Sequence, residues 1–124
     1  MGRETLKNTL SQQVQVLERD FSVIMRSTTT WNDLQTRSLN VLSITIHRLT
    51  TTIDSLPARG ALTLDMRHEL RNQLTILMGY AQLMLHRRAG EMPQEASATL
   101  KKMMTLILHM NASLDEDRFE ARNS

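Results

Sequence analysis

The sequence predicts an all-α protein in which antiparallel helical hairpins form a four-helix bundle. First, apolar residues recur at alternating spacings of three and four along four separate segments, which is typical of helices with one face against a core. Second, aromatic residues make up only 3% of the 124 residues whereas nine residues are Met, a composition that suits helix packing better than a sheet sandwich. Third, the breaks between these segments are short, and short links favour antiparallel neighbours.

The first two predicted helices cover residues 4–26 and 31–56. Thr29 or Thr30 is expected to cap the second helix, with Asp33 in its first turn, where a negative charge is favourable. The β-branched residues of the second helix would also fit a strand, but the spacing favours a helix. The expected core stripes are Leu6, Leu10, Val14, Leu17, Phe21 and Ile24, then Trp31, Leu34, Leu42, Ile46, Leu49, Ile53 and Leu56, with Ser38 filling one turn.

The third and fourth predicted helices cover residues 63–89 and 94–117. Thr63 is the expected N-cap of the third helix. Gly90 is expected to end that helix, and Pro93 to begin the next. The expected core stripes are Leu70, Leu74, Leu77, Ala81 and Met84, then Leu100, Met103, Ile107, Met110 and Leu114.

Pro57 and Gly60 mark the one candidate boundary between halves. We therefore divide the chain into an N-terminal helical hairpin at 1–57, a second hairpin at 62–117 and a frayed tail at 118–124. Two architectures satisfy this pattern. The four helices close one bundle within a single chain, or the second hairpin pairs with its copy in a homodimer and the first hairpin extends it.

Composition excludes several classes of protein. The formal net charge is only +2 and no dense basic run occurs, so nucleic acid is not an expected partner. No segment approaches the roughly 18 consecutive apolar residues of a membrane span, so no membrane association is expected. Without cysteine there is neither a disulfide framework nor a thiolate metal site. A cytoplasmic location is the simplest expectation.

The most informative feature is a histidine on the polar side of the third predicted helix. At about 100° per residue, His68 lies roughly 200° from Leu70 and so points away from the core stripe. Asn72 and Thr75 follow four and seven positions later and share its face, and Glu69 places a carboxylate beside it. A histidine directed at water, with an acid and an amide nearby, is placed for chemistry with a partner.

The other three histidines do not point to a metal. His47, His86 and His109 form no pair at spacings of three or four with one another, so no metal site is expected. His86 is expected at the surface, and His109 at the border of the core.

Residues 67–85, RHELRNQLTILMGYAQLML, resemble the phosphoacceptor helix of the dimerisation and phosphoacceptor domain of sensor histidine kinases. The family pattern is His-Glu/Asp-Leu-Arg-Thr/Asn-Pro-Leu, followed a turn or two later by a Gly-Tyr-like pair. Residues 68–72 match it consecutively, Leu74 matches, and residues 79–80 supply the pair. Gln73 stands where many members have a proline that bends the helix, which predicts a straighter helix here.

The resemblance covers about residues 62–117 and implies roles for three side chains. His68 would accept a phosphoryl group. Glu69 would assist the transfer as an orienting group or general base. Asn72 would position a water for hydrolysis of a partner's phosphoaspartate.

The resemblance also implies the partner, which is a response-regulator receiver domain, a histidine kinase, or both. Arg67 and Arg71 are expected to attract phosphate or an acidic receiver surface, and Thr75 shares the face presented to it. Mg²⁺ is expected on the receiver, because this chain has no clustered carboxylates, and no cofactor is expected on the chain itself.

The family's ATP-binding domain has no room before the chain ends at Ser124, so no autonomous ATP-dependent kinase activity is expected. The chain would be a histidine phosphotransferase, or the phosphoacceptor subunit of a kinase whose catalytic domain sits on another polypeptide. The main alternative is a non-catalytic adaptor or inhibitor that binds a histidine kinase or a response regulator through the bundle. A generic helical bundle with a structural or nucleic-acid role is a further alternative.

Overall fold

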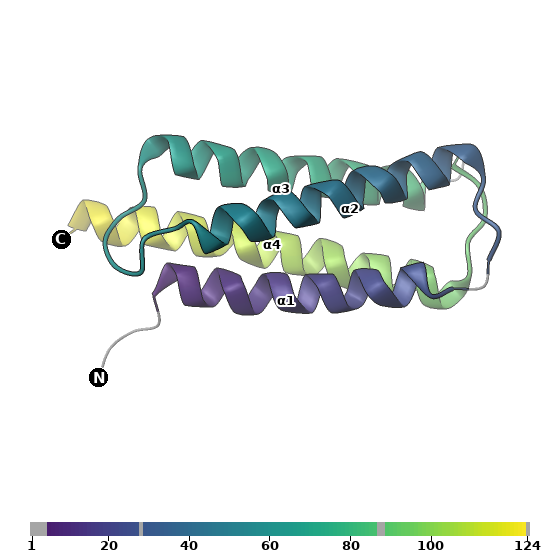
Figure 1. The fold of residues 1–124 in the computed structure, drawn as a ribbon, viewed down its shortest axis with the longest axis horizontal. Coiled ribbons are helices and arrows are strands. Elements are labelled where there is room, and N and C mark those ends of the chain that lie inside the picture. The colour runs from purple at the N-terminus through teal and green to yellow at the C-terminus, as the bar shows by residue number, and fades with distance from the viewer. Residues whose placement is uncertain (1–4, 28, 87–88, 124) are drawn as a thin grey trace.

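The computed structural model describes residues 5–27, 29–86 and 89–123, with side chains up to residue 117. It contains four helices, and no strand among the described residues: α1 (Leu6–Met25), α2 (Asp33–Asp54), α3 (Leu64–Leu85) and α4 (Gln94–Asn123). Successive helices run in opposite directions, so the start of α1 and the end of α4 lie at the same end as the α2–α3 connection (Figure 1). The predicted all-α four-helix bundle is confirmed.

The bundle closes within one chain. α2 lies between α1 and α3, and α4 packs against both α1 and α3. The most extensive contacts join α2 to α3 and α1 to α4, so the two hairpins are held together more extensively than the helices within each hairpin. Of the two architectures open at the sequence level, the structure has the single-chain bundle.

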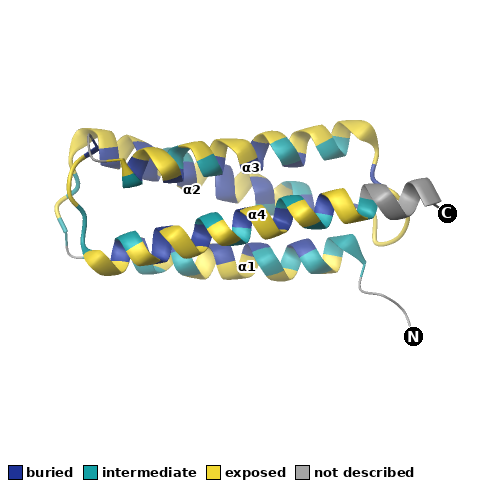
Figure 2. Ribbon diagram, turned by 180° about the vertical axis from the view of Figure 1, so that it is seen from behind, coloured by how far each residue is buried: buried dark blue, intermediate teal, exposed yellow. Residues whose placement is uncertain are grey.

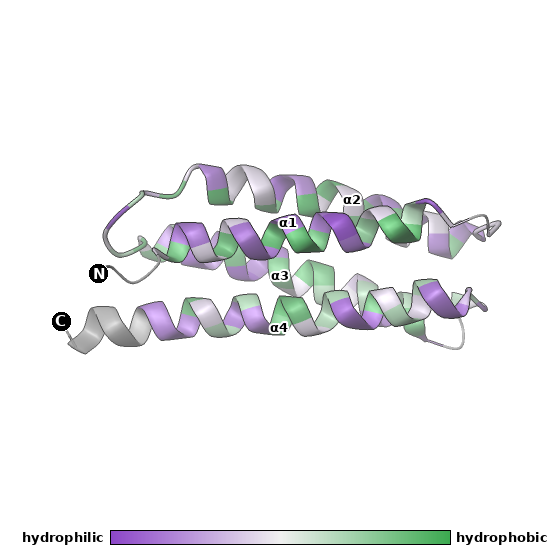
Figure 3. Ribbon diagram, turned by 90° about the horizontal axis from the view of Figure 1, so that it is seen from below, coloured by the Kyte–Doolittle hydropathy of each residue, from purple (hydrophilic) through white to green (hydrophobic). Residues whose placement is uncertain are grey.

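The apolar stripes of all four helices meet in one continuous core. Figure 2 shows the buried residues along the inner sides of the helices, and Figure 3 shows hydrophilic and hydrophobic residues alternating along each helix. The predicted stripes of α3 and α4 are buried in full, and in α1 only Leu6 is partly exposed. Predicted core positions are therefore confirmed along most of the chain.

One core prediction in α2 is wrong. Leu34 is 38% exposed, while Gln35, Ser38 and Leu39 are buried. The inward face of α2 passes through these three positions, which places Leu34 on the flank of the helix. Leu34 follows the predicted spacing, but each of the three successive steps of four from Leu34 through Ser38 and Leu42 to Ile46 rotates the stripe by about 40°, so its first position leaves the inward face.

The N-cap of α2 also differs from the prediction. Asn32 caps the helix, rather than Thr29 or Thr30: its side chain accepts a hydrogen bond from the Gln35 backbone N–H at 2.7 Å. The Gln35 side chain accepts one in return from the Asn32 backbone N–H at 3.0 Å, which completes a capping box. The predicted cap of α3 is confirmed, because Thr63 Oγ1 accepts from the Met66 backbone N–H at 3.1 Å.

The same two side chains fasten the α3–α4 connection to the start of α2. Asn32 Nδ2 donates to the Ala89 carbonyl at 2.6 Å, and Gln35 Nε2 donates to the Glu91 carbonyl at 3.0 Å. Gly90 lies between these carbonyls with φ +107°, a conformation that L side chains rarely adopt. It therefore shapes this loop rather than ending α3, whose last helical residue is Leu85.

α4 continues to Asn123, six residues beyond its predicted end at 117. Its last turns contain residues of good helix propensity, which accounts for the extension. None of the described helices combines the length and apolar character that a membrane-spanning helix needs.

Gln73 is a buried polar residue in the middle of α3. Its Nε2 donates to Thr52 Oγ1 on α2 at 2.9 Å, but its Oε1 accepts no hydrogen bond from any described residue. Thr52 Oγ1 also donates to the Arg48 carbonyl, so it keeps a partner if Gln73 is removed. A buried acceptor without a partner lowers the free energy of unfolding.

We predict that Gln73→Leu stabilises the protein, because it removes this acceptor and adds an apolar side chain of similar size to the core. The free energy of unfolding should rise by about 1 kcal/mol in urea denaturation. The control is Gln82→Leu at an exposed position of the same helix, which should change stability by less than about 0.5 kcal/mol. A loss of stability in Gln73→Leu would show that the hydrogen bond from Gln73 to Thr52 stabilises the fold more than the unpaired oxygen of Gln73 destabilises it.

Candidate functional site

Four of the six side chains that the sequence singled out form an exposed surface on α3. His68, Glu69, Asn72 and Thr75 are all exposed. His68 lies in the second turn of the helix, close to the end of the bundle where the α2–α3 connection runs (Figure 1). The expected outward orientation of His68 is confirmed, and Glu69 beside it is exposed as well.

The backbone behind this surface is firmly held. Leu70, Leu74 and Leu77 lie on the opposite side of α3 and are 0–1% exposed in the shared core. The N-cap hydrogen bond of Thr63 begins the helix one turn before His68. A packed helix fixes the backbone positions from which the side chains of the site project.

The two arginines are directed elsewhere. Arg67 Nη1 donates to the Leu114 carbonyl at 2.9 Å, and its Nη2 pairs with the Asp117 carboxylate at 2.5 Å. The Arg67 side chain is only 11% exposed. This guanidinium therefore joins the start of α3 to the end of α4, and it is not part of the exposed surface.

Arg71 forms the second link between these helices. It pairs with the Asp115 carboxylate of α4 near the surface, where the side chains of Arg71 and Asp115 are 39% and 66% exposed. An exposed ion pair contributes little to stability and exchanges readily with other partners. Arg71 is consequently the more accessible of the two cations beside His68.

Asp115 and Asp117 are neighbours of the site that were not predicted from the sequence. The signal was nevertheless present, because in an antiparallel hairpin a residue early in one helix lies beside a residue late in the other. Arg67 with Asp117 and Arg71 with Asp115 follow this rule, because the later residue in α3 pairs with the earlier residue in α4.

The other histidines lie apart from this surface. His47 on α2 and His86 at the end of α3 are exposed. His109 is exposed as well, whereas the sequence placed it at the border of the core; its position on α4 lies between the buried stripe residues Ile107 and Met110 but turns outward. Among the described residues, no group of three or more His, Asp or Glu side chains is arranged to hold a metal ion.

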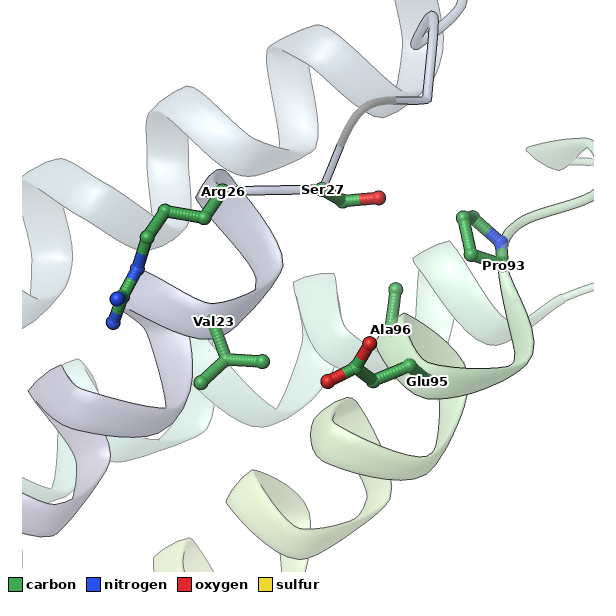
Figure 4. A pocket seen from close by; sticks show the side chains of 6 residues that line it. All are labelled: Val23, Arg26, Ser27, Pro93, Glu95 and Ala96. Carbon is green, nitrogen blue, oxygen red and sulfur yellow. The ribbon is translucent and has the colours of Figure 1, made fainter.

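The pocket shown in Figure 4 lies at the opposite end of the bundle, between the end of α1 and the start of α4. Figure 4 shows the Glu95 carboxylate turned toward Val23, while Arg26 extends away from it. None of the predicted site residues lines this pocket. Its lining is Val23, Arg26, Ser27, Pro93, Glu95 and Ala96.

Comparison of the chain with family models, with curated proteins and with solved structures gave no match in any of the three. The functional interpretation of this surface is therefore based on its residues and their geometry.

We predict that Arg67 contributes more to stability than Arg71. Arg67→Met removes two charge-assisted hydrogen bonds from a largely buried position and should lower the free energy of unfolding by about 1.5–3 kcal/mol. The matched variant Arg71→Met breaks an exposed pair and should cost less than about 1 kcal/mol. Urea denaturation of both variants checks this, and equal losses would contradict the distinction.

Proposed function

We propose that this chain acts in a two-component or phosphorelay system, in which His68 exchanges a phosphoryl group with an aspartate of a response-regulator receiver domain. The observation that carries the proposal is the exposed set of His68, Glu69 and Asn72 on one rigid helix. The resemblance of residues 67–85 to the phosphoacceptor helix of histidine kinases suggests the chemistry. The absence of cysteine fits a reducing cytoplasm as the compartment.

The transfer requires an accessible nucleophile and little further covalent chemistry from the chain. A ring nitrogen of neutral His68 attacks the phosphorus atom of the phosphoaspartate. The N–P bond forms as the acyl P–O bond breaks, and the receiver's aspartate leaves as a carboxylate. The proton on the other ring nitrogen passes to Glu69 or to water, and the reverse sequence returns the phosphoryl group.

Asn72 supports a second reaction of the same partner. It lies one helical turn beyond His68 on the exposed side of α3. There its amide would hold a water molecule in line with the phosphoaspartate, and attack by this water releases inorganic phosphate and the free aspartate. Mg²⁺ belongs to the receiver in both reactions.

A specific observation supports the non-catalytic alternative, an adaptor or inhibitor that binds a kinase or a receiver. Arg67 and Arg71 are both paired with carboxylates of α4, so the cations nearest His68 are partly neutralised within the chain. In phosphotransfer, Arg71 must exchange Asp115 for the phosphoryl group or the receiver surface. In an adaptor, both ion pairs stay in place and His68 is only a contact residue.

We predict that His68→Gln abolishes phosphate uptake. Gln keeps a polar side chain of similar size at an exposed position, but its amide nitrogen is not a nucleophile. Transfer from receiver domains labelled with radioactive phosphate should fall to the level measured without the chain. The matched control is His109→Gln on α4, also exposed, which should transfer as the unaltered chain does.

Binding of the receiver, measured by calorimetry, separates the two proposals. His68→Gln should still bind the receiver if the chain is a phosphotransferase whose nucleophile has been removed. Unchanged phosphate uptake by His68→Gln would rule out the phosphoacceptor role. A stable complex with no transfer, even to the unaltered chain, would favour the adaptor.

We predict that Asn72→Ala slows dephosphorylation of the receiver by about tenfold or more, because the attacking water is no longer positioned. Phosphate transfer to His68 should change by less than about threefold, since Asn72 does not act in that step. Release of inorganic phosphate and transfer are measured in parallel. Unchanged phosphate release would remove the phosphatase role and leave the transfer role standing.

A further inference from the structure

The two halves of the chain repeat the same buried pattern. A shift of 60 residues places each buried apolar residue of α1 on one of α3: Leu10 on Leu70, Val14 on Leu74, Leu17 on Leu77, Phe21 on Ala81 and Ile24 on Met84. A shift of 61 residues places the buried apolar residues of α2 on buried apolar residues of α4, from Leu39 on Leu100 to Ile53 on Leu114. The buried polar residues Gln35 and Ser38 fall on the buried Ala96 and Thr99, and the buried Thr45 falls on Leu106, which is partly buried. The repeat includes an exposed position, because Val16 and Ile76 are each 41% exposed.

The hydrogen bonds between helices repeat as well. Gln73 Nε2 donates to Thr52 Oγ1 between α3 and α2, and Gln13 Nε2 donates to Ser113 Oγ between α1 and α4. These partners correspond under the same two shifts. Gln13 Oε1 and Gln73 Oε1 are also the two buried side-chain atoms that lack a hydrogen-bond partner among the described residues.

A third pair of contacts joins the start of one helix to the end of the next. Lys7 Nζ donates to the Asp54 carbonyl at 3.0 Å, and Arg67 Nη1 donates to the Leu114 carbonyl at 2.9 Å. Lys7 and Arg67 correspond directly, and the two carbonyls differ by one position. A two-fold axis along the bundle would exchange α1 with α3 and α2 with α4, which is also how the most extensive helix contacts are arranged.

The repeat breaks at the exposed residues of the candidate site. Where α3 has His68, Glu69 and Asn72, α1 has Asn8, Thr9 and Gln12. Asn8 and Gln12 are exposed like their counterparts, while Thr9 is partly buried. Asn8 cannot act as a nucleophile and Thr9 supplies no carboxylate.

It breaks again at the opposite end of the bundle. Asn32 and Gln35 on α2 fasten the α3–α4 connection, but their counterparts on α4 are Pro93 and Ala96, which cannot donate side-chain hydrogen bonds. The pocket of Figure 4 lies there, between Pro93 and Ala96 on one side and Val23 and Ser27 on the other. We therefore attribute the pocket to the absence of side-chain hydrogen bonds like those of Asn32 and Gln35 at this position, and not to a second functional site.

We propose that the N-terminal hairpin is a second copy of the C-terminal hairpin that lacks the residues of the candidate site. The two copies in one chain form a bundle with two-fold symmetry, in which only the exposed side of α3 is a working face, meaning a face that can accept phosphate. Each chain then receives one receiver domain, on the exposed side of α3, and the equivalent side of α1 stays empty. The single working face rests on the proposed function, whereas the internal two-fold does not.

The two-fold is tested without any partner. Gln13→Cys with Ser113→Cys, and Thr52→Cys with Gln73→Cys, introduce two equivalent thiol pairs into a chain that has no cysteine of its own. A short thiol-reactive cross-linker should join both pairs at comparable rates, within a monomer of 14.2 kDa. The mismatched pair Gln13→Cys with Thr52→Cys should react far more slowly. Reaction of only one matched pair, or products of twice the mass, would overturn the two-fold bundle.

The single face is tested by restoring the second one. Asn8→His, Thr9→Glu and Gln12→Asn together copy the candidate site onto α1. With receiver domains phosphorylated by acetyl phosphate and Mg²⁺, the unaltered chain should take up one phosphate, the triple variant two, and the triple variant combined with His68→Gln one.

Intact-mass spectrometry counts these phosphates and separates the outcomes. One phosphate in both the unaltered chain and the triple variant would overturn the silent copy and leave the proposed function intact. If none of the three proteins takes up phosphate while both matched cysteine pairs are cross-linked, the proposed function is wrong and so is the single receiver-binding face. The internal two-fold symmetry would still hold.

Discussion

The core in which four apolar stripes meet is the constraint on which the rest of this structure depends. Each stripe repeats at spacings of three and four, so each helix has one inward face and leaves the opposite side free. Burial of Leu17, Leu42 and Leu77 at 0% exposure shows how completely the inward faces are covered. Because the face of α3 opposite Leu77 has no packing role, it is available for the polar residues of the candidate site.

The same core relates the two hairpins. Helices that belong to different hairpins make the most extensive contacts, and equivalent polar side chains, Gln13 and Gln73, lie at equivalent places on the flanks of the core. The two hairpins share their buried positions and differ at exposed ones. This is expected, because changing a core side chain by one methylene affects stability, whereas an exposed substitution is usually tolerated. Asn8 and His68 thus occupy matching exposed positions on matching helices and differ in their chemistry.

Much of the fold was predictable from sequence because spacing alone fixes which face of a helix is buried. Leu70, Leu74 and Leu77 followed from that rule, and so did the outward direction of His68. Leu34 was mispredicted because repeated steps of four residues drift by about 40° each, so a stripe traced back from Ile46 reaches the flank of the helix at Leu34. The capping box of Asn32 with Gln35 was missed because it depends on where the helix begins, which spacing fixes only to within a few residues.

The candidate site was predictable in part for the same reason. The residues on the exposed side of α3 follow from one helix, so His68 and Asn72 needed no knowledge of tertiary contacts. The pairing of Arg67 with Asp117 depends on the register between two helices, which the apolar pattern leaves open. The shared burial of the side-chain oxygens of Gln73 and Gln13 likewise required the arrangement of the whole bundle.

The central claim is that the exposed imidazole on α3 carries a phosphoryl group. The most direct measurement incubates the full chain with phosphorylated receiver domains, and then compares the stability of the chain-bound phosphate in acid and in base. The account predicts phosphate that is lost in acid, is retained in base, and is located by peptide fragmentation at residue 68. Phosphate that survives acid, phosphate located elsewhere, or none at all would contradict it.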